Sequence, residues 1–138
     1  MDPAKQELVQ IWLTKAQQDL AVAHKLSSGS DPYLGAAIFH CQQAAEKAVK
    51  GFLTFRDQEF EKTHNIRLLV DLAIPFEASF VDWHEVGARL TPYATKFRYP
   101  GETMQPEPEE FQQALTDAEG LYTFVLSVLP AEVHPPTR

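Results

Sequence analysis

The sequence is poor in cysteine and in positive charge. Its one cysteine, Cys41, excludes an internal disulfide bond and a cysteine-based metal cluster, and a lone thiol suits a reducing compartment. Twelve Lys and Arg residues stand against 19 Asp and Glu residues, which gives a formal net charge of −7. This balance argues against an extended nucleic-acid surface, although it is compatible with a small basic pocket.

Long apolar runs and strand patterns are also missing. No stretch approaches the roughly 18 apolar residues of a membrane span, and the polar residues 1–7 contain no signal-like apolar core. No alternating run of apolar and polar residues is bounded by a hairpin turn. We therefore expect a cytoplasmic protein that makes no membrane contact and has no β-sheet.

Apolar residues at helical spacing, by contrast, are abundant and predict five helices. The predicted helices span Pro3–Leu26, Pro32–Arg56, His64–Ala73, Ala78–Lys96 and Glu107–Leu129. A chain of 138 residues is long enough to bury a proper core around them. We expect an all-α, up-down helical bundle of four to five helices in residues 1–130, followed by a frayed, proline-rich tail in residues 131–138.

The sequence also predicts helix caps, one kink and the residues that face the core. Asp2, Asp31 and Thr63 are predicted N-caps, and Pro92 should kink the fourth helix because it lacks a backbone N–H. The residues predicted to face the core are Leu8, Trp12, Ala16, Leu20 and Ala23 in the first helix, and Leu68, Leu69 and Leu72 in the third.

The second predicted helix has two different faces when its residues are placed at steps of roughly 100°. The broad apolar face is formed by Leu34, Ile38, Cys41, Ala45, Ala48, Val49, Phe52 and Phe55. The narrow polar arc opposite is formed by His40, Gln43, Lys47 and Lys50. A solvated face and a binding surface are both compatible with this arc, and a Glu46–Lys50 pair at i,i+4 would account for part of it.

The same helix carries a resemblance to a known family. The segment Phe39–Leu53, FHCQQAAEKAVKGFL, resembles the signature helix of HEPN domains, the "higher eukaryotes and prokaryotes nucleotide-binding" family. Lys62–Leu69 and Phe97–Pro100 resemble the family's Thr-His-Asp-Leu and Arg-Tyr-Pro motifs. The resemblance covers about Leu8–Leu129. It implies a four- or five-helix bundle that is often a homodimer and is often encoded beside, or fused to, a minimal nucleotidyltransferase.

Some HEPN proteins are ribonuclease toxins that use an Arg followed, after four to six residues, by a His. That spacing is missing here. Seven residues, one more than the range allows, separate Arg56 from His64, and no His follows Arg98 within the required range. A metal site would need three or four converging ligands, and His40, His64 and His84 are far apart in sequence. We therefore expect no catalytic residues, no metal and no cofactor.

Candidate binding residues remain for a nucleotide such as ATP. Lysine and arginine side chains can neutralise phosphates, and aromatic rings can stack on a base. For the two tyrosines, simple packing is an equally good interpretation, and for His64 a first-turn position in a capped helix is the favoured one. The candidates are His40, Gln43, Lys47, Lys50, Lys62, His64, Tyr93, Arg98 and Tyr99.

Three hypotheses about function follow. The preferred one is a non-catalytic nucleotide-binding or accessory subunit that works with a minimal nucleotidyltransferase. The second is a divergent HEPN ribonuclease toxin of a toxin–antitoxin pair, with Arg98 and His64 or His40 replacing the usual residues. The third is a purely structural dimerisation module that uses Phe39 and the fourth helix.

Overall fold

The computed structural model describes residues 1–100 and 104–136. Residues 101–103, in the predicted loop between the fourth and fifth helices, and residues 137–138, at the end of the predicted tail, lie outside the described residues. Every regular element in the described ranges is a helix, which confirms the all-α prediction. The elements are α1 (Pro3–Ser27), α2 (Leu34–Phe55), α3 (Ile66–Ala73), η1 (Ala78–Trp83), α4 (His84–Leu90), η2 (Thr91–Ala94), α5 (Pro108–Ser127) and η3 (Ala131–Val133), where η marks a 3₁₀ helix.

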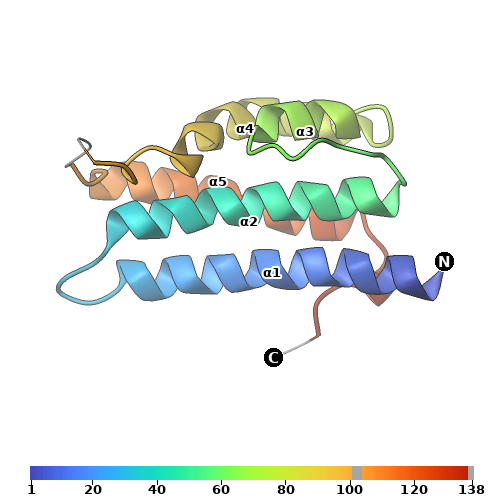
Figure 1. Ribbon diagram of the computed structural model, residues 1–138, viewed down its shortest axis with the longest axis horizontal. Coiled ribbons are helices and arrows are strands. Elements are labelled where there is room, and N and C mark those ends of the chain that lie inside the picture. The colour runs from blue at the N-terminus through green and yellow to red at the C-terminus, as the bar shows by residue number, and fades with distance from the viewer. Residues whose placement is uncertain (101–103, 137–138) are drawn as a thin grey trace.

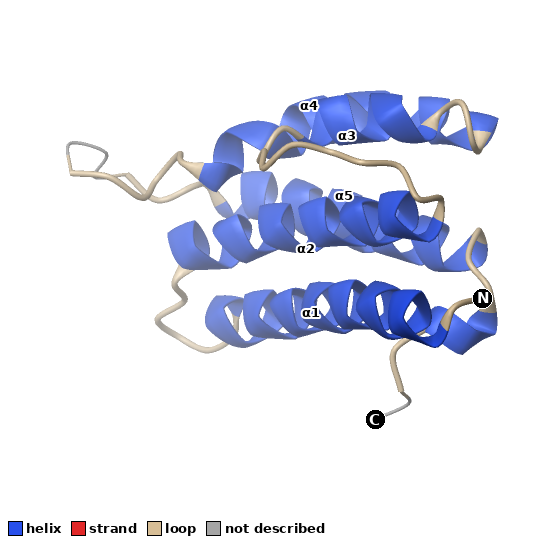
Figure 2. Ribbon diagram, turned by 45° about the vertical axis from the view of Figure 1, so that its right-hand side comes forward, coloured by secondary structure: helices blue, strands red, loops and turns tan. Residues whose placement is uncertain are grey.

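Helix α2 occupies the centre of the bundle. It runs antiparallel to α1 on one side, with α5 behind it and the short helices α3 and α4 across its other side (Figures 1 and 2). Fourteen of its 22 residues are buried, so α2 lacks the broad solvated face of a surface helix. The predicted core face of α2 is confirmed, with Ile38, Cys41 and Val49 fully buried. Among the described residues, no helix combines the length and apolar character needed to cross a membrane.

The core stripe of α1 is shifted from the prediction in its first half. Val9 and Leu13 are fully buried, whereas Leu8 is 48% exposed and Trp12 is only partly buried. Both pairs have the same four-residue spacing, and α1 packs mainly against one neighbour, α2. The narrow contact therefore selects one of two apolar rows that periodicity alone cannot distinguish. In the second half of α1, the predicted core residues Ala16, Leu20 and Ala23 are buried as expected.

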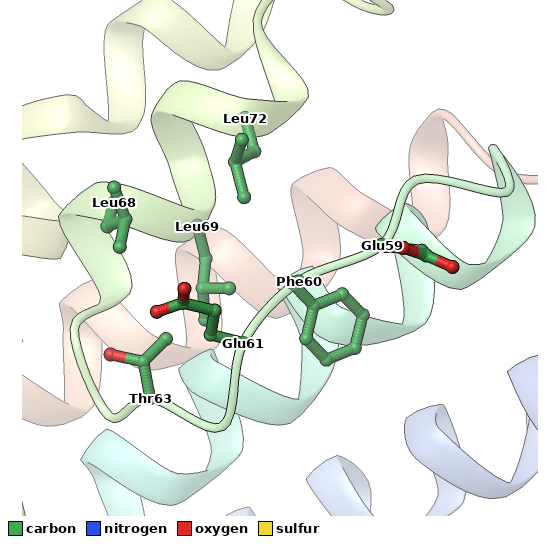
Figure 3. A pocket seen from close by; sticks show the side chains of 7 residues that line it. All are labelled: Glu59, Phe60, Glu61, Thr63, Leu68, Leu69 and Leu72. Atoms are coloured by element: carbon green, nitrogen blue, oxygen red, sulfur yellow. The ribbon is translucent and has the colours of Figure 1, made fainter.

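Helix α3 begins two residues later than predicted and has a different cap. The side chain of Asn65, not that of Thr63, accepts a hydrogen bond from the backbone N–H of Leu68 at 3.1 Å. Thr63 instead accepts one from the backbone N–H of Asn65 at 3.0 Å. Leu69 is buried, but the prediction was wrong for Leu68, which is 45% exposed on the outer side of this eight-residue helix (Figure 3).

The first residues of α2 also differ from the prediction. The helix begins at Leu34 rather than at Pro32, and its N-cap position is Tyr33 rather than Asp31. The first helix begins at Pro3 as predicted, and Asp2 occupies its N-cap position. Its cap bond comes from the backbone, because the N–H of Gln6 donates to the carbonyl oxygen of Asp2 at 2.9 Å.

The predicted fourth helix is divided into η1, α4 and η2, and Pro92 lies at the start of η2 as its missing N–H requires. The hydroxyl of Thr91 connects the end of α4 to the start of α3. It donates to the carbonyl oxygen of Gly87 at 2.7 Å and accepts from the backbone N–H of Ile66 at 3.0 Å. Gly87 itself lies against the backbone of α3, where a Cβ atom would come within 3.0 Å of the Cα atom of Arg67.

Residues 131–134 of the predicted frayed tail, 131–138, pack back onto the bundle. Val133, in η3, is fully buried. The side chain of Gln10 on α1 donates to the carbonyl oxygen of His134 at 2.9 Å. The His134 ring, through Nε2, lies 2.9 Å from the carbonyl oxygen of Leu126 near the end of α5. The prolines here limit regular structure to the three-residue 3₁₀ helix η3 without preventing packing.

Replacing Gly87 with Ala should destabilise the protein by about 1–3 kcal/mol, because the added methyl group meets backbone atoms of α3 that cannot rotate away. Urea unfolding followed by circular dichroism measures the change in the free energy of unfolding. Gln112→Ala, at an exposed position of α5, is the control and should change it by less than about 0.5 kcal/mol. Equal stability of both variants would contradict the close contact of α3 and α4.

Candidate functional site

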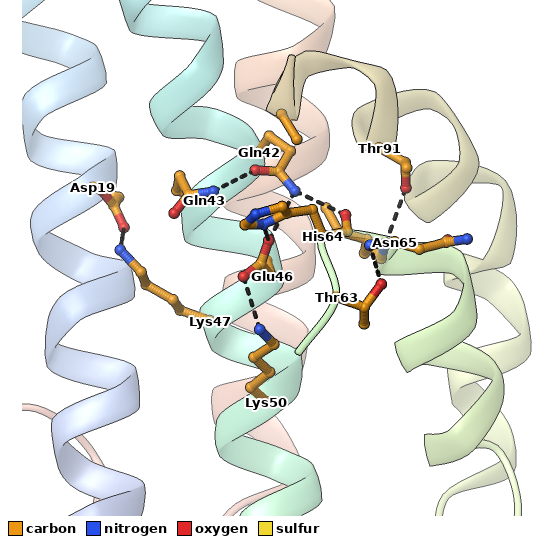
Figure 4. A network of polar contacts seen from close by, with 12 residues as sticks. Asp19, Gln42, Gln43, Glu46, Lys47, Lys50, Thr63, His64, Asn65 and Thr91 are labelled. Carbon is orange, nitrogen blue, oxygen red and sulfur yellow. Dashed lines mark hydrogen bonds and ion pairs between the residues drawn. The ribbon is translucent and has the colours of Figure 1, made fainter. Parts of the chain in front are cut away.

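Two buried carboxylates organise the polar side chains of α2. The first is Glu46, which is 4% exposed and lies among three polar groups. Its Oε2 atom accepts from the ammonium group of Lys50 at 2.9 Å, and its Oε1 atom lies 2.7 Å from Nδ1 of His64. The side-chain amide of Gln42 donates to the same Oε1 atom at 3.1 Å (Figure 4). The predicted Glu46–Lys50 pair is therefore confirmed.

The second carboxylate is Asp19 of α1, which is 7% exposed. Its Oδ1 atom lies 2.8 Å from Nδ1 of His40, and its Oδ2 atom accepts from the ammonium group of Lys47 at 2.7 Å. No Asp or Glu lies three or four residues from His40 in the chain, so its carboxylate partner comes from another helix. The available signal was an acidic residue, Asp19, within the buried stripe of α1.

Gln42 and Gln43 connect the Glu46 group to the rest of the polar arc. The amide of Gln43 donates to the side-chain oxygen of Gln42 at 2.7 Å, and the amide of Gln42 also donates to the backbone carbonyl of His64 at 3.0 Å. The network joins α2 to the connection that precedes α3 (Figure 4). Gln42 is fully buried, and the sequence analysis had not assigned it to either face.

The two histidines present the same chemistry to solvent. An ionised carboxylate only accepts hydrogen bonds, so Asp19 and Glu46 each orient a ring by accepting from its Nδ1 atom. Within the described residues, neither Nε2 atom has a hydrogen-bonding partner. The side chain of His64 is 66% exposed and that of His40 is 28% exposed. Both rings can therefore offer Nε2 to a ligand.

Lys50 is more buried than its position in the predicted polar arc of α2 indicated. Its side chain is 10% exposed, and its ammonium group lies 5.8 Å from the ring centre of Trp12 and 5.7 Å from that of Phe60. A phosphate would have to displace Glu46 from this lysine. Lys47 is more accessible, with 23% of its side chain exposed. Lys62 lies exposed on the connection between α2 and α3.

The aromatic and arginine candidates form two further groups. The guanidinium of Arg98 lies 3.9 Å from the ring centre of Phe39, and the Phe39 ring makes an edge contact with His40. Tyr93 is elsewhere, with its hydroxyl donating to the carboxylate of Glu110 on α5. Burial and this hydrogen bond raise the pKa of Tyr93.

Of the predicted residues, the structure therefore brings His40, Lys47 and Gln43 together on α2, with His64 beside them and Arg98 reaching His40 through Phe39. We do not include the two candidate tyrosines in this group: Tyr99 is 55% exposed, and the hydroxyl of Tyr93 contacts α5 through Glu110. We call His40, Gln43 and Lys47, together with His64 from the connection that precedes α3, the outer strip of α2. Asp19 holds His40 and Lys47 in place, Glu46 holds His64, and Gln42 holds Gln43.

Comparisons with known proteins agree with this architecture. The model of the family described as "HEPN domain" matches residues 9–128. The crystal structure of ST0689, an archaeal HEPN homologue, is 27% identical, with a TM-score of 0.66 over 86% of this chain and 95% of that one. The crystal structure of TT1696 from Thermus thermophilus is 29% identical, with a TM-score of 0.68 over 88% of this chain and 98% of that one. A search of curated proteins finds no match.

Replacing Glu46 with Gln should destabilise the fold by about 3 kcal/mol, because the ammonium group of Lys50 would stay buried without a counter-charge. The matched control is Glu119→Gln, which removes a carboxylate from an exposed pair with His24 and should cost less than about 1 kcal/mol. Chemical unfolding of both variants gives the two free energies. Equal losses would mean that burial of the Glu46 pair is not what matters.

Cys41 is fully buried, as predicted, and burial raises the pKa of its thiol from 9.0 to about 12. The native protein should therefore react with a thiol reagent at pH 8 only when it opens, and the denatured protein should react at once. Because the folded pKa is the higher one, the Cys41 contribution to the free energy of unfolding is unchanged below pH 9.0 and falls as pH rises from there to about 12. Native labelling as fast as denatured labelling would contradict the buried position.

Proposed function

The chain belongs to the HEPN domain family, and we propose that it is a non-catalytic, nucleotide-binding accessory subunit that works with a minimal nucleotidyltransferase. The observation that supports this proposal best is the outer strip of α2. Two imidazoles and one ammonium group are held there in fixed orientations by carboxylates from behind. Such ordering reduces the entropy lost when a ligand is bound.

Local charge supports a phosphate as the part of the ligand that binds the strip. Asp19 and Glu46 contribute two negative charges, which Lys47 and Lys50 balance. These charges cancel, and the partly exposed rings of His40 and His64 add no negative charge, although the chain as a whole carries −7. A local site of this kind suits a small anionic ligand better than a long nucleic acid.

The neighbouring aromatic group supports a nucleotide rather than a simple anion. The ring of Phe39 lies against His40 and carries the guanidinium of Arg98 on its face. One guanidinium nitrogen, Nη1, donates to the carbonyl oxygen of Ala94 at 2.9 Å. The planar group offers a surface on which a base can stack, and its other N–H groups can donate to phosphate. Phosphate and base would thus be bound by adjacent groups along α2, with Phe39 and His40 between the Arg98 guanidinium and Lys47.

A ribonuclease remains the second candidate because of one specific observation. His40 and His64 each form a pair with a carboxylate, an arrangement that orients an imidazole for general acid–base catalysis. The missing Arg-to-His spacing of HEPN ribonucleases argues against it. The partner nucleotidyltransferase, the homodimer and the toxin–antitoxin role rest on family resemblance and stay predictions.

Calorimetric titration with ATP, and separately with inorganic tripolyphosphate, tests the accessory function. Lys47→Gln and His64→Gln should each weaken ATP binding by about five- to tenfold, since each removes one charge-assisted hydrogen bond. The control Lys25→Gln removes the same charge from an exposed position of α1 and should leave the affinity within twofold.

If neither ATP nor tripolyphosphate gives heat, direct nucleotide binding is refuted. If Lys25→Gln weakens ATP binding as much as Lys47→Gln does, the binding is a general attraction between charges and not recognition by the outer strip. Incubation with a labelled RNA separates the second candidate. Cleavage that is lost in both His40→Asn and His64→Asn would replace the accessory role with a catalytic one.

A further inference from the structure

A groove next to the outer strip, along the connection that carries His64, has no role in the proposed nucleotide site. It lies between α3 and the connection that precedes it, and its volume is about 450 Å³ (Figure 3). Its lining is formed by Glu59, Phe60, Glu61, Thr63, Leu68, Leu69 and Leu72. None of these residues belongs to the outer strip of α2.

The groove has a fixed apolar wall. Leu68 and Leu72 are separated by one turn of α3 and therefore lie on the same side of the helix. Leu68 is 45% exposed although its position in the sequence predicts burial. On the opposite wall, the ring of Phe60 is held by an edge contact with Trp12 at 6.3 Å between ring centres. An apolar surface of this kind is available before any ligand arrives.

The rim of the groove is acidic. Glu59 and Glu61 flank Phe60 on the connection, and both are exposed. Among the residues that the structure describes, neither carboxylate has a cationic partner, whereas Asp71 on the same helix as Leu68 is paired with His84 at 2.8 Å. The groove therefore combines exposed leucine surface with unpaired negative charge, and a complementary ligand must supply aliphatic groups and positive charge together.

We propose that this groove binds an amphipathic helix of a partner protein, which presents two aliphatic side chains one turn apart and flanks them with Lys or Arg. A helical turn rises about 5.4 Å, so two such side chains match the separation of Leu68 and Leu72 along α3. The basic residues of the partner pair with Glu59 and Glu61 at the rim. This is helix-in-groove recognition, in which the apolar contact provides affinity and the charges provide orientation.

The test uses a fluorescein-labelled, 14-residue peptide of Leu and Lys arranged as an amphipathic helix, with anisotropy as the readout. Leu68→Ser should weaken binding by roughly fivefold or more, because it removes half-exposed apolar surface from the wall. The double substitution Glu59→Gln and Glu61→Gln should weaken it about threefold at low salt and reduce its salt dependence.

Matched controls lie outside the groove. Ile11 on α1 is 44% exposed, so Ile11→Ser removes a similar apolar surface, and Glu77→Gln removes one negative charge elsewhere. Both should leave peptide affinity within twofold. Circular dichroism confirms that each variant is folded, and ATP titration of Leu68→Ser, which should be unchanged, separates this proposal from that for the outer strip.

Several results would overturn the proposal. The first is the absence of peptide binding up to about 1 mM. The second is an equal loss of peptide affinity in Ile11→Ser and Leu68→Ser. The third is that a peptide in which Glu replaces every Lys binds as tightly as the Lys peptide. A change of oligomeric state in Leu68→Ser, measured by sedimentation equilibrium, would instead assign the groove to contact between copies of this chain.

Discussion

Burial of the Glu46 carboxylate in the central helix is the constraint on which the polar organisation of the bundle depends. A charge removed from water is tolerated only when opposite charge and hydrogen bonds replace the lost solvation. Lys50, His64 and Gln42 provide that replacement, and they come from α2 itself and from the connection to α3. The same requirement at Asp19 draws His40 and Lys47 toward α1. Stability and the placement of candidate ligand groups thus have a common cause.

This common cause explains why the polar arc of α2 is neither a plain solvated face nor a fully open site. All four of its side chains direct their polar atoms at internal partners, and the exposed fraction of the side chain decreases from His40 to Lys47 to Lys50. A ligand at the outer strip therefore meets groups that already have their orientation. The groove beside α3 differs, because Leu68 on its wall is 45% exposed and Glu59 and Glu61 on its rim have no cationic partner among the described residues.

Periodicity in the sequence predicted the helices and the core face of α2 because a broad buried arc leaves a strong signal. It failed where a helix has a narrow contact: Leu8 and Leu68 belong to apolar rows beside the buried ones, and only packing chooses between rows. The candidate site was predicted in part. His40 and Lys47 could be placed on one face of a helix, but their shared partner, Asp19, is 21 residues from His40 in the chain and is brought close only by the antiparallel packing of α1 and α2.

The Thr91 hydroxyl connects the two short helices α3 and α4. It completes the hydrogen bonding of the last turn of α4 and of the first N–H of α3 with one oxygen atom. Neither helix is long enough to be stable alone in water. Because one hydroxyl serves both helices, displacement of either one removes a hydrogen-bonding partner from the other, and the two short helices are coupled through a single side chain.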